Sequence, residues 1–113
     1  MPAKGGSAKG YYSNYATGIR AENHVANHYK SNGWSVIQSA GSRGAADLKC
    51  TKGDVQHYVQ VKSSTSGNPY ISNHEIGRLK STATRNDATS VIAKVTPDST
   101  TIQYAKIDKN VKL

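Results

Sequence analysis

Residues 46–62 read ADLKCTKGDVQHYVQVK, and this stretch predicts two strands joined by a tight turn. The first strand is expected over Ala46–Thr51. The second is expected over Val55–Lys62, where apolar and polar residues alternate as they do in a half-buried strand. Because this alternation has a period of two, the side chains of Gln60 and Lys62 project together from one face of the strand.

A helix is predicted before these strands, over Asn14–Ser31. At the spacing of an α-helix, one apolar face is formed by Tyr15, Ile19, Ala26 and Tyr29. Glu22 falls in the middle of that face, where a carboxylate is costly unless its charge is compensated. A cation bound where this face meets the sheet would explain the residue.

A second helix is predicted after the two strands, and it begins with a capping box in which Ser72 precedes Glu75 by three residues. This second helix is predicted over Asn73–Thr84, and the remaining elements are the strands Trp34–Gln38, Thr89–Val95 and Thr101–Ile107. The order α-β-β-β-α-β-β predicts an α/β sandwich in which helices flank a mixed central sheet.

The length of 113 residues suits one domain, which we expect over residues 14–113. Residues 1–13 are rich in Gly, Ser and Lys and show no periodicity, so they are predicted to form a flexible basic arm. The arm either contacts DNA through residues such as Lys9 or is a plain disordered terminus.

The chain is strongly basic, with 15 Lys and Arg residues against 7 Asp and Glu and a formal charge of +8. Such an excess favours a polyanionic partner, because neutralising phosphates releases their condensed counterions. A basic protein without such a partner is the alternative.

The single cysteine, Cys50, excludes an intrachain disulfide and a cysteine-based zinc site. No apolar run approaches the ~20 residues that span a bilayer, and residues 1–10 lack the apolar segment of a signal peptide. An intracellular protein without a membrane partner is therefore expected.

The polar residues of the central strands suit phosphodiester hydrolysis, which needs an activated water, a metal ion and a nearby positive group. Asp47 would be the principal ligand of Mg²⁺, a hard cation that takes oxygen ligands, and Mn²⁺ should substitute. The Gln60 amide and the Val61 carbonyl could supply further oxygens. Lys62 would orient or activate the water and stabilise the charged phosphorane, and Glu22 would bind the metal through water or bind a second ion.

Asp47 followed by Gln60-Val61-Lys62, together with Glu22 on the preceding helix, resembles the PD-(D/E)XK nuclease superfamily. Within it, the small size, helix-first order and basic charge look most like the archaeal Holliday-junction resolvases, over roughly residues 15–95. This resemblance implies a restriction-endonuclease-like core and a metal-dependent endodeoxyribonuclease acting on branched DNA. It also implies a homodimer, because a four-way junction requires two symmetric nicks.

The chain departs from the family pattern at two positions. Ala46 replaces the usual proline, and Gln60 stands where Asp or Glu is usual. Mrr-type nucleases are similar in carrying a QxK motif and are active, although the lost charge makes Glu22 more necessary. In the resolvases a loop serine assists the site; Ser39 and Ser42 both fit that description, and Ser42 is preferred.

Several basic residues are expected to contact DNA phosphates. Arg43 and Lys49 flank Asp47 in the sequence and are the first candidates. The others are Lys9, Arg20, Lys80 and Arg85.

Three other functions remain open from the sequence. An Mrr-like or otherwise less structure-selective DNA nuclease would use the same site. A basic DNA-binding module that kept the fold but lost its chemistry would bind without cutting. An RNA-processing nuclease of similar fold is a further alternative.

Overall fold

The computed structural model describes residues 7–39, 44–65, 69–105 and 109–113, with the backbone alone for residues 7–17. Its elements are α1 (Ser7–Ser31), β1 (Ser35–Gln38), β2 (Leu48–Lys52), β3 (Val55–Ser63), α2 (Asn73–Arg85), β4 (Thr89–Val95) and β5 (Thr100–Tyr104). The predicted order of helices and strands is confirmed. Neither helix in this part of the chain is long and apolar enough to cross a membrane.

The strands form one sheet in the order β1-β2-β3-β4-β5. β3 and β4 pair in parallel and are connected through α2, whereas the other neighbouring strands pair antiparallel. A parallel pair needs such a crossover connection, whereas antiparallel strands can be joined by short turns. The predicted mixed sheet is therefore confirmed.

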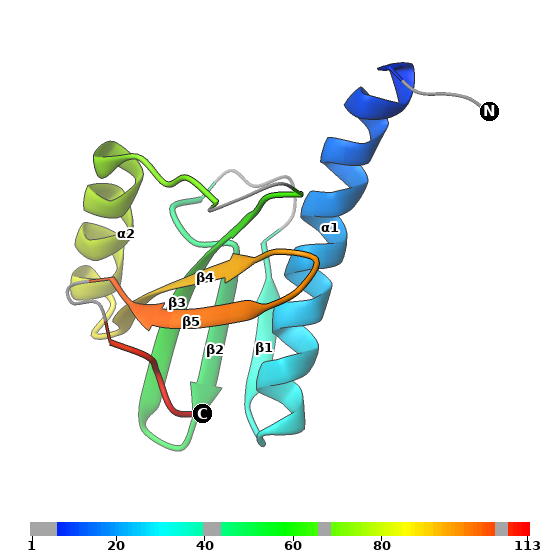
Figure 1. Ribbon diagram of the computed structural model, residues 1–113. Coiled ribbons are helices and arrows are strands. Elements are labelled where there is room, and N and C mark those ends of the chain that lie inside the picture. The colour runs from blue at the N-terminus through cyan, green and yellow to red at the C-terminus, as the bar shows by residue number, and fades with distance from the viewer. Residues whose placement is uncertain (1–6, 40–43, 66–68, 106–108) are drawn as a thin grey trace.

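The two helices cover opposite faces of the sheet (Figure 1). Alternate residues of β3 separate the two cores: Val59 and Val61 pack on the α1 side, and Tyr58 packs on the α2 side. Tyr29 of α1 and Leu79 of α2 are fully buried in their respective cores. The predicted alternation along β3 thus places Gln60 and Lys62 on the face covered by α2.

The first helix differs from the prediction at its start and in its buried face. It begins at Ser7 rather than Asn14, because each residue added to an existing helix gains a hydrogen bond without a new nucleus. Residues 7–13 of the predicted arm are therefore helical, and in Figure 1 this part of α1 extends beyond the sheet.

The buried face of α1 is centred on residues that the prediction did not use. Ala21 and Val25 are buried, whereas the side chain of Ile19 is 42% exposed. Small side chains let the helix approach the sheet closely, so the apolar stripe runs through them. Glu22 consequently lies half-buried beside this stripe rather than in its middle.

The other boundaries agree with the predicted ones to within two residues, except that β5 ends at Tyr104. The predicted end at Ile107 lies outside the described residues. The capping box of α2 is confirmed: Ser72 Oγ accepts a hydrogen bond from the Glu75 N–H at 3.1 Å, and Glu75 Oε1 accepts one from the Ser72 N–H at 3.1 Å.

A buried aromatic group joins α1 to the sheet, and His57 lies within it. The Tyr29 hydroxyl is 2.8 Å from His57 Nδ1, and the Trp34 ring lies 4.5 Å from the His57 ring. Burial lowers the pKa of His57 below its ordinary value, so the folded state favours the neutral imidazole.

Stability should therefore fall as the pH decreases below the ordinary pKa of histidine. As the pH falls, His57 becomes protonated in the unfolded chain before it does so in the folded chain. Protonation therefore favours the unfolded state, and the free energy of unfolding decreases. Between about pH 7.5 and about pH 5.5, the advantage in Tm of the wild type over His57→Gln should shrink. An equal difference in Tm at both pH values would contradict the assignment.

Candidate active site

One cavity of about 260 Å³ lies where both helices reach the end of β3. Its lining brings together residues that are distant in the sequence: Glu22 of α1, Asp47 beside the start of β2, Gln60, Val61 and Lys62 of β3, and Glu75 and Arg78 of α2. Gly44 and Ala45 complete the wall. The structure therefore brings together five of the six predicted metal-binding and catalytic residues; the sixth, Ser42, lies outside the described residues.

Asp47 is held rigidly at the base of this cavity, with 5% of its surface exposed. Its Oδ2 accepts hydrogen bonds from the Val61 N–H at 2.9 Å and from Gln60 Nε2 at 3.1 Å. Its own backbone N–H donates to the Val59 carbonyl at 2.8 Å, which extends the pairing with β3. The carboxylate is thus fixed by backbone geometry rather than by flexible side chains alone.

The surroundings of the two nearest carboxylates, Asp47 and Glu22, disfavour their charged forms. Burial raises the pKa of Asp47, although the Val61 N–H and the Lys62 ammonium oppose that rise. Burial also raises the pKa of Glu22, and the charge of Asp47 raises it further. A divalent cation between these groups would stabilise both charged forms.

The donor set fits a hard cation that keeps several waters. Magnesium sites typically use one or two carboxylates, and Asp47 and Glu22 supply two. Gln60 presents its amide nitrogen to Asp47, and rotation of the amide group would present its oxygen instead. In the described part of the chain, no three His, Cys, Asp or Glu side chains form a cluster that could hold a metal. Oxygens from an amide, a carbonyl or water would therefore complete the coordination of a bound cation.

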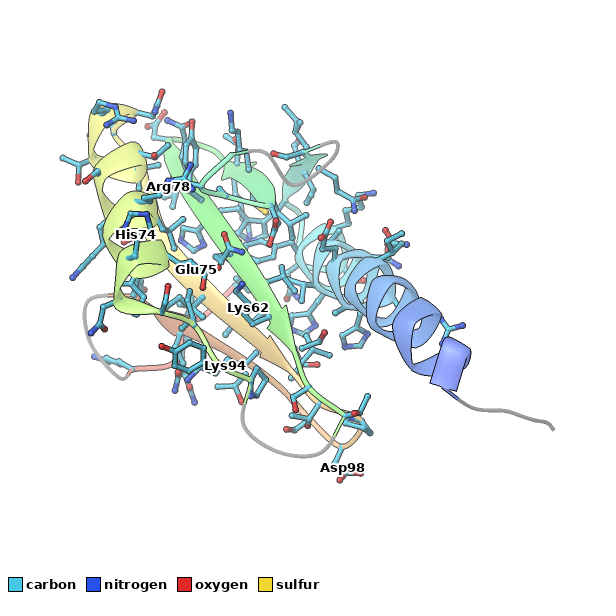
Figure 2. The ribbon with its side chains drawn as sticks, turned by 90° about the horizontal axis from the view of Figure 1, so that it is seen from above. Lys62, His74, Glu75, Arg78, Lys94 and Asp98 are labelled. Carbon is cyan, nitrogen blue, oxygen red and sulfur yellow. The ribbon has the colours of Figure 1, made fainter. Side chains whose placement is uncertain are left out.

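Lys62 reaches across the cavity to α2, where its ammonium forms an ion pair with Glu75. Figure 2 shows the two side chains pointing toward one another from β3 and from the first turns of α2. The hydrogen bond from Lys62 and the one from the Ser72 N–H lower the pKa of Glu75. This carboxylate is therefore charged and tightly oriented.

Two residues of the cavity, Glu75 and Arg78, were absent from the predicted site. The capping box accounted for Glu75, and nothing singled out Arg78. The predicted topology could have indicated both residues, because in a β-α-β crossover the helix starts near the carboxyl end of the preceding strand. The first turns of α2 must therefore lie near Lys62.

Of the two loop serines considered for the site, Ser39 is among the described residues and Ser42 is not. Ser42 lies outside the described residues, as does Arg43. Ser39 Oγ donates to the Ala46 carbonyl at 3.0 Å, so it supports the backbone beside Asp47.

Among the predicted DNA contacts whose side chains are described, none lines this cavity. Lys49 is exposed with its Nζ 5.3 Å from the centre of the Tyr58 ring. Arg20 lines a groove that α1 forms with residues 63–65 and the end of β4. Lys80 and Arg85 are on α2, with Lys80 half-buried and Arg85 exposed. The side chain of Lys9 is not among those described.

Comparison with known proteins identifies the family of the chain and supports the fold. The chain matches the family model of the archaeal Holliday junction resolvases (Hjc) over residues 13–112. Its fold is similar to the 1.6 Å structure of Archaeoglobus fulgidus Hjc, a Holliday junction resolvase from an archaeal hyperthermophile, with a TM-score of 0.73. The two share 20% sequence identity over 85% of this chain and 79% of that chain, which confirms the restriction-endonuclease-like fold. No curated protein matches the chain.

Because the family model covers most of its length, the protein belongs to the archaeal Holliday junction resolvase family and is a nuclease of branched DNA.

Proposed function

We propose that the protein is a Mg²⁺-dependent endodeoxyribonuclease that resolves four-way DNA junctions as a homodimer inside the cell. The observation that carries this proposal is the convergence of Glu22, Asp47, Gln60 and Lys62 on one cavity. Mn²⁺ is expected to replace Mg²⁺, since the ligands are oxygens that both ions accept.

Each residue of the cavity has a role that follows from its position. Asp47 and Glu22 would hold the metal ion, with oxygens of Gln60 and Val61 as further ligands. The bound ion would supply charge stabilisation and a more acidic water. Lys62 orients the attacking water and stabilises the negative charge of the phosphorane, and Arg78 binds a phosphate oxygen at the cavity wall.

Binding is expected to rest on a wider basic surface than the cavity. Lys9, Arg20, Arg43, Lys49, Lys80 and Arg85 are the proposed phosphate contacts. Because many distributed charges contribute, the loss of any one of them should weaken binding only modestly, while added salt should weaken it strongly.

A homodimer would place two cavities on one junction so that both strands are cut. We propose that the dimer interface involves α2 and the last two strands, β4 and β5. On α2, one groove is lined mostly by polar residues, among them His74, Ser81 and Thr82. Polar contacts, rather than an apolar core, would therefore form this part of the interface.

A direct test incubates the purified protein with a labelled four-way junction and with the matching linear duplex, in Mg²⁺ and in EDTA. Paired nicks in the junction alone, only with Mg²⁺, are the expected result. Equal cutting of both substrates would indicate an Mrr-like, less selective nuclease. Binding without cutting at any Mg²⁺ or Mn²⁺ concentration would indicate an inactive DNA-binding module, and RNA cleavage that persists in EDTA would indicate an RNA-processing enzyme.

Gln60→Glu should lower the Mg²⁺ concentration needed for cleavage, because it restores a charged ligand beside Asp47. The half-saturating Mg²⁺ concentration is expected to fall by about threefold to tenfold, as more ligand charge tightens binding of a hard cation. Gln56→Glu is the matched control: Gln56 lies on the same face of β3, where its amide donates to the Asn86 carbonyl. Loss of cleavage at every Mg²⁺ concentration would show that the hydrogen bond from Gln60 to Asp47 is essential instead.

A further inference from the structure

We propose that Glu75 is a positioning residue of the active site, which holds the Lys62 ammonium in place for catalysis and makes the start of α2 part of the catalytic apparatus. The proposal rests on the proposed nuclease function and adds a residue from outside the predicted motif. It follows from the contacts of one carboxylate with two partners.

The two oxygens of Glu75 have separate tasks. Oε1 accepts hydrogen bonds from the N–H and the Oγ of Ser72, both at 3.1 Å, whereas Oε2 pairs with Lys62 Nζ. The capping box thus anchors one side of the carboxylate to the backbone. The other oxygen is thereby directed toward Lys62, where it pairs with the ammonium.

Lys62 needs such an anchor, because a lysine ammonium sits on a flexible four-carbon stem. Its side chain is 28% exposed, so packing alone does not fix the position of the ammonium. Lys94 of β4 is the register partner of Lys62, and Figure 2 shows both lysines on the face of the sheet where α2 begins. Like charges opposite one another repel. Glu75 therefore compensates the charge that would displace Lys62.

The glutamine at position 60 makes the Glu75 carboxylate more important for Lys62. In the usual pattern of the superfamily, an acidic residue stands two positions before the lysine, but here that residue is Gln60. The acidic partner of Lys62 comes from α2 instead. The cavity thereby keeps a carboxylate beside its lysine although the strand lacks one.

A purely structural role predicts a different result from substitution. If Glu75 serves only the capping box, Glu75→Gln should be harmless, because glutamine fills the same position of a capping box. Ser72→Ala, by contrast, removes the cap hydroxyl but leaves the charge of Glu75. The two variants therefore separate the cap from the ion pair.

The experiment measures single-turnover cleavage of the four-way junction at saturating protein, junction affinity, and the side-chain ammonium signal of Lys62 in ¹H–¹⁵N NMR spectra. For Glu75→Gln, we expect cleavage to slow by about 10- to 100-fold, the range for a misplaced catalytic group, with affinity and Tm unchanged. The Lys62 ammonium signal should broaden or vanish as the group becomes mobile. Ser72→Ala should lower the Tm while keeping cleavage within about threefold of the wild type, and Glu75→Asp should recover part of the lost rate.

Three results would overturn the proposal. Wild-type cleavage by Glu75→Gln would show that the charge is not needed, and an equal loss in Ser72→Ala would assign the effect to the cap. Slow cleavage with an unchanged Lys62 signal and a higher Mg²⁺ requirement would make Glu75 a metal ligand. A wild-type protein that does not cut would refute the proposed nuclease instead, while the NMR signal would still report on the ion pair.

Discussion

Asp47→Asn is expected to abolish cleavage while leaving the fold intact and slightly more stable. The change removes the charge of the principal metal ligand but keeps an oxygen that can accept from the Val61 N–H. Cleavage should fall by at least about 1,000-fold, the upper range for loss of one charge-stabilising group. Junction binding should remain within about threefold, because it rests on distributed charges.

The gain in stability follows from the pKa of Asp47. Burial raises this pKa above the value in the unfolded chain, so the folded state holds the proton more tightly. Stability contributed by the protonated form is present at low pH and is lost as the pH rises through the raised pKa. At neutral pH in EDTA, the variant should therefore melt at a higher temperature than the wild type.

Thermal melts in EDTA and in Mg²⁺, together with single-turnover cleavage, test both parts. Mg²⁺ should raise the Tm of the wild type but not that of Asp47→Asn, since binding to the folded state alone stabilises it. Cutting at the wild-type rate would show that the site is wrong. A lower Tm in EDTA would show that the Asp47 carboxylate stabilises the fold, contrary to the effect of its burial.

Lys62→Met should slow cleavage by about 100- to 1,000-fold, because it removes the positive group that stabilises the phosphorane. Methionine preserves much of the apolar stem, so the packing along β3 should be retained. Glu75 would lose its partner, but it lies near the surface and keeps its hydrogen bonds to Ser72. Little change in Tm is therefore expected.

Lys49→Met is the matched control for this substitution. Lys49 lies on the neighbouring strand β2 but outside the cavity, with its ammonium over the ring of Tyr58. At saturating protein it should cleave within about threefold of the wild type, and the defect should appear in affinity and its salt dependence. Equal rate losses in the two variants would indicate that both lysines act through DNA binding, and Lys62 would then have no special catalytic role.

Much of the fold and the heart of the site could be predicted because they depend on local patterns. The alternation along β3 placed Gln60 and Lys62 on one face, and the Ser72–Glu75 pair marked the start of α2. Asp47 and Lys62 could be assigned to one site because they lie on two strands that follow one another in the sequence and were expected to be neighbours in the sheet. The buried face of α1 was harder to predict, because Ile19 is more apolar than Ala21 and yet is the more exposed of the two.

The sequence by itself determined the order of the elements, the mixed sheet and the chemical character of the site, because strand period, capping and turn residues act over a few positions. Only the tertiary structure decided that Glu75 and Arg78 belong to the same cavity as Glu22 and Asp47. The physical reason is the crossover from β3 through α2 to β4, which returns the helix start to the strand that carries Lys62. Such proximity arises from the packing of a helix on a sheet. The local sequence pattern of the helix does not indicate which of its polar side chains will face the residues of another element.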